Sequence, residues 1–270
     1  MLASAVTEKE NLLEIDGLAK TFKGLRAVDG YRLRLPAGEI LGIIGPNGAG
    51  KSTVFNLLTG HIRPSGGTIR FRGRDITRLS PDRIARLGIG RTFQNIRLFP
   101  SMTVLENVVS ARQLRDRSGL LPTILSLPSF HSTEKRLARE ALEELDLFGL
   151  ADRAEAPATS LPYGDQRRLE IVRALALGPS LLLLDEPTAG MNPSETQALM
   201  DFIVHLRDEL GITILLIEHQ MRVVMGISET VTVLDYGEKI AEGTPAEIQC
   251  NPRVIEAYLG RGSANQQVMA

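Results

Sequence analysis

Several features that mark other protein classes are scarce in this sequence. Its 270 residues include no Trp, 4% aromatic residues and a single cysteine, Cys250. One cysteine cannot form an internal disulfide, which favours a reducing compartment over secretion. The opening residues also lack a basic start followed by an apolar stretch, so we expect a cytoplasmic N-terminus rather than a secretion signal.

Long apolar runs and an excess of one charge are missing as well. The longest runs, 181–184 and 212–217, fall far short of the roughly 20 residues that span a bilayer, so we expect the chain not to enter the membrane. Thirty-one Lys and Arg against thirty-two Asp and Glu leave a net charge of -1, which removes the usual electrostatic reason to expect a nucleic-acid partner. The 43% share of hydrophobic residues is ordinary for a globular protein.

Short apolar runs alternate with helical patterns along the chain, which is typical of a layered α/β fold with a largely parallel sheet. Three predicted strands each end in polar residues: 39–44 before the loop GPNGAGKST, 181–184 before Asp185 and Glu186, and 212–217 before Glu218 and His219. Ligands bind at the carboxyl edge of such sheets. We therefore expect the three polar clusters to converge on one site.

The section from Met102 to Leu150 has a mainly helical pattern. Its apolar face is spaced at Leu137, Ala141, Leu145 and Phe148. Residues 119–130 interrupt the pattern with two prolines and are expected to form an irregular insertion. The section therefore predicts a helical lobe.

Two further helices are indicated by their ends. Asn192 supplies an N-cap, Pro193 a proline at the first helical position and Glu195 an acid three residues after the cap. This pattern predicts a helix that runs to about Leu210. A short helix is expected near Leu259.

Residues 45–52, GPNGAGKS, match the phosphate-loop pattern G-x-x-x-x-G-K-S/T between a predicted strand and a predicted helix. The glycines let backbone N–H groups turn toward phosphate oxygens at the positive N-terminus of the helix, and Lys51 reaches the outer phosphates. Ser52 is expected to bind Mg²⁺. The pattern predicts a nucleoside triphosphate site that comprises Gly45, Pro46, Asn47, Gly48, Ala49, Gly50, Lys51, Ser52 and Thr53.

Two adjacent acids follow the four leucines at 181–184. Asp185 has the position of the carboxylate that holds Mg²⁺ beside a phosphate loop. Glu186, one residue nearer the substrate, can orient and deprotonate water, an assistance worth about 10²- to 10⁴-fold in rate. The alternative is that Glu186 only caps a turn before Pro187, but two acids beside a phosphate loop favour hydrolysis.

The segment LPYGDQ at 161–166, followed by RRLEIVRALA, resembles the signature of ATP-binding-cassette (ABC) proteins. The order of the motifs is also similar to that family: phosphate loop, Gln94 in RTFQN, signature, LLLLDEP, AGMN, and His219 in IEHQ. The resemblance covers roughly residues 12 to 260 and implies a single ABC ATPase domain. The implied fold is an α/β P-loop core with a mainly parallel sheet at about 12–95 and 166–260, an antiparallel β edge subdomain, a helical subdomain at about 96–165, and flexible ends at 1–11 and 261–270.

The resemblance also implies roles for matching residues. Phe22 matches the aromatic that stacks on adenine, although a core position is the alternative for it. Gln94 resembles the residue that touches Mg²⁺ or the attacking water and links the nucleotide to the transmembrane subunit. His219 resembles the switch histidine that holds the γ-phosphate and the catalytic carboxylate in line.

In this family two cassettes pair head to tail, which implies that Tyr163, Gly164, Asp165 and Gln166 contact ATP bound by the partner. This chain departs from the commoner signature by having Pro162 and Tyr163 in place of Ser-Gly, and it has Asn192 where Asp is commoner. Pro162 has neither a hydroxyl nor an N–H group, so the contact must depend on Gly164 and the helix N-terminus. Weaker or asymmetric activity is expected.

The signature segment, the AGMNP turn, the insertion before the signature and the ending VIEAYLG are similar to one branch of the family, the larger ATPase subunit of branched-chain amino-acid importers. The branch implies hydrolysis of ATP with Mg²⁺, a sister ATPase subunit, two permease subunits and a solute-binding protein outside the cell. It also implies a peripheral location on the cytoplasmic face of the inner membrane. Close relatives serve urea or short amides, so the solute stays open.

Other functions fit less of the sequence. A small-molecule kinase would share the phosphate loop but has no use for a signature helix. A soluble cassette protein of DNA repair or translation generally carries two cassettes or a long coiled coil, and neither is present here. An exporter cassette, such as the lipopolysaccharide-extraction ATPase, is the nearest alternative.

Overall fold

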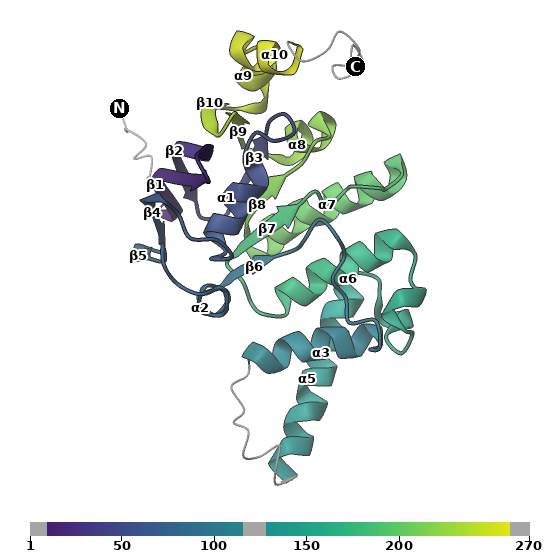
Figure 1. The fold of residues 1–270 in the computed structure, drawn as a ribbon. Helices are drawn as coiled ribbons and strands as arrows, with labels where there is room; N and C mark the ends of the chain where they lie inside the picture. The colour runs from purple at the N-terminus through teal and green to yellow at the C-terminus, as the bar shows by residue number, and fades with distance from the viewer. Residues whose placement is uncertain (1–9, 116–127, 260–270) are drawn as a thin grey trace, which may run out of the picture. The chain divides into compact units, whose positions relative to one another are not determined.

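The computed structural model describes residues 10–115 and 128–259 (Figure 1). The described residues form two compact units. The first contains the residues up to Ile84 and those from Met200 onward, and the second runs from Ala85 to Leu199. The limits of these units differ from the limits expected for the core and the helical subdomain. The expected division into core and helical subdomain stays a prediction.

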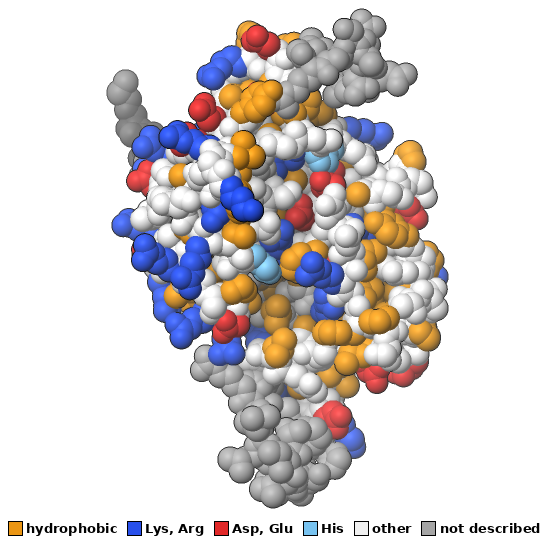
Figure 2. Space-filling view, viewed as in Figure 1, with side chains coloured by type: hydrophobic (Ala, Val, Ile, Leu, Met, Phe, Trp, Pro, Cys, Tyr) orange, Lys and Arg blue, Asp and Glu red, His pale blue; other side chains and the backbone are white. Residues whose placement is uncertain are grey.

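An antiparallel sheet of four strands, in the order β2-β1-β4-β5, lies in the first unit. Its strands are β1 (Asn11–Phe22), β2 (Leu25–Pro36), β4 (Gly66–Phe71) and β5 (Arg74–Asp75). Side chains alternate between the two faces, so that Leu33 and Leu35 of β2 are buried while Arg32 and Arg34 are exposed. Figure 2 shows Lys and Arg side chains gathered over this sheet. The antiparallel part of the predicted fold is confirmed.

The other strands of the first unit are mainly parallel. They are β3 (Ile40–Ile44), β8 (Thr213–Ile217), β9 (Thr230–Asp235) and β10 (Glu238–Gly243). β3 pairs in parallel with both β8 and β9, and β10 is antiparallel to β9. β3 and β8 are buried along their whole length, as expected for parallel strands covered on both faces. The predicted strands 39–44 and 212–217 are confirmed to within one residue.

Four helices lie wholly within the first unit: α1 (Lys51–Leu58), α8 (Met221–Ile227), α9 (Pro245–Gln249) and α10 (Pro252–Leu259). Gly42 of β3 allows α8 to pack closely, because a Cβ at that position would lie 2.4 Å from Cγ1 of Val224. α10 confirms the short helix expected near Leu259. None of the helices in the described ranges 10–115 and 128–259 is long and apolar enough to cross a membrane.

The second unit combines two parallel strands, β6 (Ile89–Arg91) and β7 (Leu181–Asp185), with the helices α3 (Val104–Arg115), α5 (Pro128–Leu147) and α6 (Tyr163–Leu175). The three helices pack against one another, and 3₁₀ turns at Ala151–Arg153 and Ala158–Ser160 connect α5 to α6. Two helices, α2 (Pro81–Arg86) and α7 (Pro193–Leu210), span the sequence limits of the units. β7 and α7 confirm the predicted strand 181–184 and the predicted helix to Leu210.

The helical lobe predicted for 102–150 is present as α3 and α5. The predicted apolar face is buried at Leu137, Ala141, Leu145 and Phe148. The irregular insertion is wrong at 128–130, because α5 already begins at Pro128, and proline suits the first position of a helix. Residues 119–127 of that predicted insertion lie outside the described residues.

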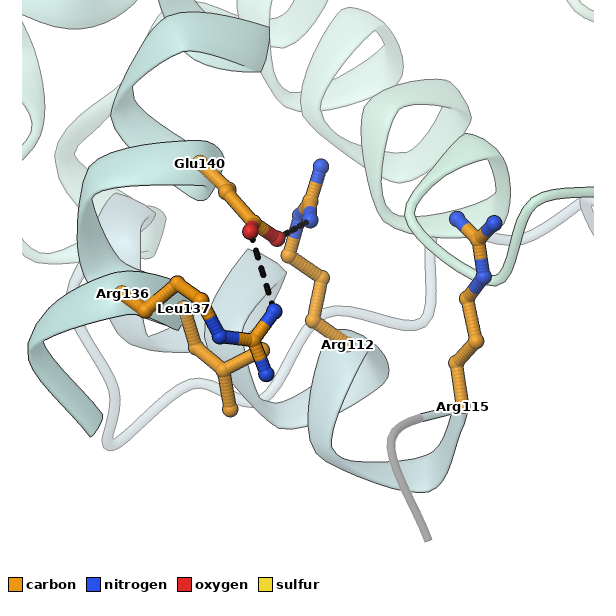
Figure 3. A pocket seen from close by; sticks show the side chains of 5 residues that line it. All are labelled: Arg112, Arg115, Arg136, Leu137 and Glu140. Carbon is orange, nitrogen blue, oxygen red and sulfur yellow. Dashed lines mark hydrogen bonds and ion pairs between the residues drawn. The ribbon is translucent and has the colours of Figure 1, made fainter. Parts of the chain in front are cut away.

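Charged side chains tie α3 to α5 around a hollow of about 300 Å³ that is lined by Arg112, Arg115, Arg136, Leu137 and Glu140 (Figure 3). Arg112 on α3 pairs with both Glu140 and Glu144 on α5. Arg136 pairs with Glu140 at 3.0 Å. A single guanidinium with two carboxylate partners fixes the spacing of the two helices.

Candidate nucleotide site

The predicted phosphate loop connects the buried strand β3 to the helix α1. Gly45 and Gly50 have φ angles of 150° and 105°, which favour glycine. A Cβ would lie 2.0 Å from the carbonyl oxygen of Leu234 at Gly45, and 2.4 Å from that of Ala27 at Gly50. Both positions therefore require glycine for backbone angle and for space, and the chain has the strand–loop–helix arrangement that a phosphate site needs.

Lys51 begins α1, and only 5% of the residue is exposed. Its Nζ donates hydrogen bonds to the carbonyl oxygens of Gly45, at 2.7 Å, and Pro46, at 3.0 Å. The ammonium group therefore lies inside the loop. Gly50 is the N-cap of α1 and provides no side-chain cap, so the first-turn N–H groups suit an anion.

The other predicted loop residues differ in exposure: Asn47, Gly48 and Ser52 are exposed, Pro46 and Thr53 are half-buried, and Ala49 is buried. An exposed hydroxyl directly after the lysine is accessible to a cation bound near the loop. The carbonyl oxygen of Ala49 accepts a 2.9 Å hydrogen bond from the N–H group of Gly237, which attaches the loop to the turn between β9 and β10.

Tyr258 on α10 adds a contact to the phosphate loop that the sequence did not indicate. Its phenol lies near the backbone of Gly45, and burial raises the pKa of the phenol to about 12. The hydroxyl therefore stays neutral and can hold the first residue of the loop in place. Tyr258 belongs to the segment VIEAYLG, whose pattern gives no indication of a contact with the phosphate loop.

Phe22 and His219 also belong to the first unit. Phe22 ends β1 and is 43% exposed, with Nζ of Lys20 4.9 Å from the centre of its ring. This exposure leaves a ring face accessible to a base, whereas a core position would bury it. His219 lies two residues after the end of β8 and is exposed, and its backbone N–H group donates to Oε2 of Glu218 at 3.1 Å.

Asp185 lies in the second unit, at the end of β7, and is buried. Nη2 of Arg91, at the end of the neighbouring strand β6, donates a hydrogen bond to Oδ2 of Asp185 at 3.0 Å. Burial raises the pKa of the Asp185 carboxyl, and the bond to Arg91 acts against that shift. Arg91 thus fixes the carboxylate that was assigned to Mg²⁺, a role that sequence reasoning missed.

Glu186 is half-buried and has a positive φ of 48°, which is uncommon for a residue with a side chain. Nε2 of Gln94 donates a hydrogen bond to Oε2 of Glu186 at 2.9 Å. The structure therefore brings together two residues that stand 92 positions apart in the sequence. The predicted catalytic acid and the predicted water-orienting amide are neighbours.

The signature residues form the beginning of α6. Tyr163 and Gly164 occupy its first turn, and the N-cap Pro162 makes no side-chain hydrogen bond, as its chemistry predicts. Asp165 pairs with Arg153 at 2.7 Å, and the side chain of Gln166 donates to the carbonyl oxygen of Leu161 at 2.8 Å. The first-turn backbone N–H groups of α6 are therefore suited to an anion.

A hollow of about 230 Å³ lies in front of this turn and is lined by Pro162, Gly164, Asp165, Arg168, Met191 and Glu195. Glu195 and Asn192 form the predicted capping box of α7: the Glu195 N–H group donates to Asn192 Oδ1 at 2.9 Å, and the Asn192 N–H group donates to Glu195 Oε2 at 3.0 Å. Asn192 is therefore a cap in this chain, which explains how an amide is accepted where Asp is commoner.

The residues assigned to Mg²⁺ offer only oxygen ligands of the kind that this ion prefers, namely the hydroxyl of Ser52, the carboxylate of Asp185 and the amide oxygen of Gln94. The donor chemistry therefore fits Mg²⁺. Convergence of the three strand ends on one site stays a prediction, because the phosphate loop and His219 belong to one compact unit while Asp185, Glu186 and Gln94 belong to the other.

Comparison with known proteins gives a consistent result. The family profile "ABC transporter" matches residues 28–189, which is more than half of the chain. A second profile, "Branched-chain amino acid ATP-binding cassette transporter", matches residues 238–264. The high-affinity branched-chain amino acid transport ATP-binding protein LivG of Salmonella typhimurium is 48% identical over 249 residues, which cover 92% of this chain and 98% of that protein.

Two solved structures are similar in fold as well as in sequence. A nucleotide-free ATP-binding cassette from an ABC transporter has a TM-score of 0.81 and 30% identity, covering 92% of this chain and 99% of that one. A dimeric ATP-binding cassette in a post-hydrolysis state, bound to ADP and Pi, has a TM-score of 0.74 and 26% identity, covering 86% and 98%. This chain therefore belongs to the ABC transporter family, as one of its ATP-binding cassettes.

Proposed function

We propose that this chain hydrolyses ATP with Mg²⁺ to drive the uptake of branched-chain amino acids by an ABC importer. The observation that carries the enzymatic part is the hydrogen bond between Gln94 and Glu186. Glu186 directly follows Asp185, which is bound by Arg91. An acid that is half-buried beside an amide suits the activation of one water molecule. The transport part is supported by the 48% identity to a branched-chain amino acid transport protein and by the profile match at 238–264.

The binding step uses residues of the phosphate loop. Backbone N–H groups of 45–53 and the N-terminus of α1 surround the phosphates, and Lys51 exchanges its two loop carbonyl partners for phosphate oxygens. Phe22 stacks on the adenine. Ser52 and Asp185 would hold Mg²⁺, together with Gln94, and the ion supplies charge neutralisation of the outer phosphates when bound.

In the chemical step, water attacks the γ-phosphorus in line with the leaving ADP oxygen. Glu186 accepts the proton of that water as the P–O bond to ADP breaks. Gln94 orients the same water and the Glu186 carboxylate, and His219 holds the γ-phosphate in line. The protein contributes mainly position and electrostatic stabilisation.

A complete site needs a second cassette. The uncapped turn of α6, with Tyr163, Gly164, Asp165 and Gln166, presents backbone donors beside the 230 Å³ hollow, and we assign it to the γ-phosphate of ATP on the partner subunit. A similar cassette has a dimeric structure in a post-hydrolysis state, bound to ADP and Pi. The partner here is a sister ATPase subunit.

Two permease subunits and an extracytoplasmic solute-binding protein complete the proposed importer, and the chain lies on the cytoplasmic face of the inner membrane through the permeases. Uptake of urea or short amides is the main alternative, since no residue of a cassette contacts the transported solute. Lipopolysaccharide export and a soluble cassette function fit the comparisons less well, because the relative at 48% identity is named as a branched-chain amino acid transport protein.

The test is purification of the full chain with the permeases that copurify with it, followed by reconstitution in vesicles with ATP and Mg²⁺. We expect ATP-dependent uptake of leucine, isoleucine and valine above that of urea, and no uptake with Glu186→Gln. Uptake of urea alone would move the assignment to the amide branch. Failure of the chain to copurify with any membrane protein would refute a transport role.

A further inference from the structure

Two oppositely charged side chains of α6 are buried beneath the loop that carries Gln94. Arg167 and Glu170 are each only 2% exposed, and they pair with each other at 3.1 Å. They lie within two turns of the signature residues on the same helix. A buried pair costs desolvation energy, so its retention calls for a specific role.

Both side chains bind the backbone of residues 93–97. Arg167 Nη1 donates to the carbonyl oxygen of Phe93 at 2.7 Å, and its Nη2 donates to the carbonyl oxygen of Gln94. Glu170 Oε1 accepts from the N–H group of Phe93 at 3.4 Å and from that of Arg97 at 3.3 Å. The carbonyl oxygens of the loop are thus bound by the positive Arg167, and its N–H groups are bound by the negative Glu170.

These contacts replace regular secondary structure. The loop follows β6, which ends at Arg91, and precedes α3, which begins at Val104, so its backbone groups have no strand or helix to bond them. Four of them bond instead to two side chains of one helix. The loop at 93–97 is therefore attached to α6 as a rigid piece. We call Arg167 and Glu170 the loop clamp.

The clamp also has contacts at both of its ends. On the signature side, the guanidinium of Arg167 lies 5.7 Å from the centre of the Tyr163 ring. On the catalytic side, the Gln94 whose carbonyl oxygen Arg167 binds holds Glu186 through its side chain at 2.9 Å. An uninterrupted series of contacts therefore runs from the signature turn to the catalytic acid, within one compact unit.

We propose that Arg167 and Glu170 are positioning residues that move Gln94 with the signature turn, so that ATP on the partner subunit controls the water-orienting amide of this chain's own site. This inference rests on the proposed function. When α6 is drawn toward the partner's ATP, the clamp moves residues 93–97 by the same displacement and changes the distance from Gln94 to Glu186. A displacement of about 1 Å is enough to change a catalytic rate by about 10²-fold.

Variants can separate this role from a merely structural one. Glu170→Gln removes the charge while keeping the size, and Arg167→Lys keeps the charge but replaces the planar guanidinium fork with a flexible ammonium group. A double variant, Arg167→Met with Glu170→Leu, leaves no unpaired buried charge and so is expected to fold. Arg112→Met is the matched control, because it removes a guanidinium that is also paired with carboxylates of its unit, namely Glu140 and Glu144. None of the described contacts of Arg112 is with residues 93–97.

The first measurement is amide hydrogen exchange in the full-length chain. Loss of a charge-assisted bond should raise the exchange of the Phe93 and Arg97 amides by roughly tenfold or more in Glu170→Gln, and the double variant should show the same effect. Exchange in β7 should not change. Equal exchange at both amides in the wild type and the double variant would overturn the clamp, whatever the activity.

The second measurement is ATP hydrolysis by the reconstituted complex. We expect kcat to fall about tenfold or more in the double variant, with ATP affinity within about twofold of the wild type, since the clamp acts on the water-orienting amide and not on the phosphate loop. The Hill coefficient for ATP should fall toward 1, and Arg167→Lys should restore part of kcat. Arg112→Met should retain the wild-type values.

The outcomes are distinguishable. A normal Hill coefficient and kcat in the double variant would refute the proposed control of Gln94 by the signature turn. A loss of kcat that only follows a loss of folded protein would refute it as well. If the wild-type complex itself hydrolyses no ATP, the proposed function fails, while the exchange measurement still decides whether the clamp holds the loop.

Discussion

The side-chain amide of Gln94 donates a hydrogen bond of 2.9 Å to the carboxylate of Glu186. Glu186 has a positive φ of 48°, and a backbone of this kind is retained where the surroundings fix it. Gln94, which we assign to orient the attacking water, is therefore already bonded to Glu186, which we assign to deprotonate that water. We therefore expect a movement of Gln94 to change the direction of the Glu186 carboxylate.

The first prediction concerns this acid. Glu186→Gln keeps the shape and the bond to Gln94 but cannot accept a proton, so hydrolysis should fall by about 10²-fold or more. ATP affinity should stay the same, because Glu186 has no part in the phosphate loop. Phosphate release and nucleotide binding are measured on the same preparation. Release of phosphate at the wild-type rate would show that another group is the base.

A second prediction concerns Lys51. Its ammonium lies among loop carbonyls at 2.7 and 3.0 Å and is buried, so Lys51→Ala removes a charge-assisted contact to phosphate. Such contacts are worth about 1.5 to 3 kcal/mol, and ATP affinity should drop by more than about tenfold. Lys239→Ala is a suitable control, because Lys239 pairs with Glu242 on β10. Isothermal titration with ATP distinguishes the two variants.

The sequence predicted the elements that carry continuous patterns. Four leucines before Asp185 were enough to place β7, and the spacing of Leu137, Ala141 and Leu145 was enough to find the buried face of α5. These patterns report burial directly, because hydrophobic residues must be covered. The phosphate loop was equally predictable, because the backbone of such a loop requires glycine at fixed positions.

Contacts between distant charged residues could not be predicted in the same way. Arg167 and Glu170 stand three residues apart on a helix, a spacing that normally indicates an exposed ion pair. Only the fold shows that the loop at 93–97 covers them. Arg91 was missed for a similar reason, because its partner Asp185 is 94 residues away and no local pattern connects the two strands. The helix start at Pro128 was missed because proline breaks a helix at most other positions.

A third prediction concerns assembly. Because the proposed site combines the phosphate loop of one chain with the α6 turn of another, we expect the isolated chain to hydrolyse ATP poorly. With its sister subunit it should associate more tightly in ATP than in ADP, because only the γ-phosphate bridges both surfaces. The Glu186→Gln variant is the best material, since it retains ATP. Analytical ultracentrifugation that gives the same association in ATP, in ADP and without nucleotide would count decisively against the paired site.

The last prediction concerns the route from Gln94 to the membrane, along the apolar residues Ile96, Leu98, Phe99, Pro100 and Met102. Phe99 is 47% exposed, and its ring lies 5.2 Å from the guanidinium of Arg173. Its backbone is fixed independently of the ring: the Phe99 N–H group donates to Asn107 Oδ1 at 2.9 Å, and Asn107 Nδ2 donates to the Phe99 carbonyl oxygen at 3.2 Å. An anchored backbone with an exposed aromatic suits a surface that receives a permease helix, whereas a seal of the helical lobe would bury the ring.

Phe99→Asp should therefore uncouple transport from hydrolysis or release the permease while the melting temperature and ATP affinity stay close to those of the wild type. The new carboxylate would lie near Arg173, which limits its cost to the fold. Leu114→Asp is the matched control, because Leu114 is an exposed apolar residue of α3 in the same unit. Melting temperature, nucleotide binding and permease pull-down are compared for both variants. A collapse in the stability of Phe99→Asp alone would favour the sealing role. Normal pull-down with normal transport would exclude docking at Phe99, because an unpaired charge buried in a permease interface would weaken binding.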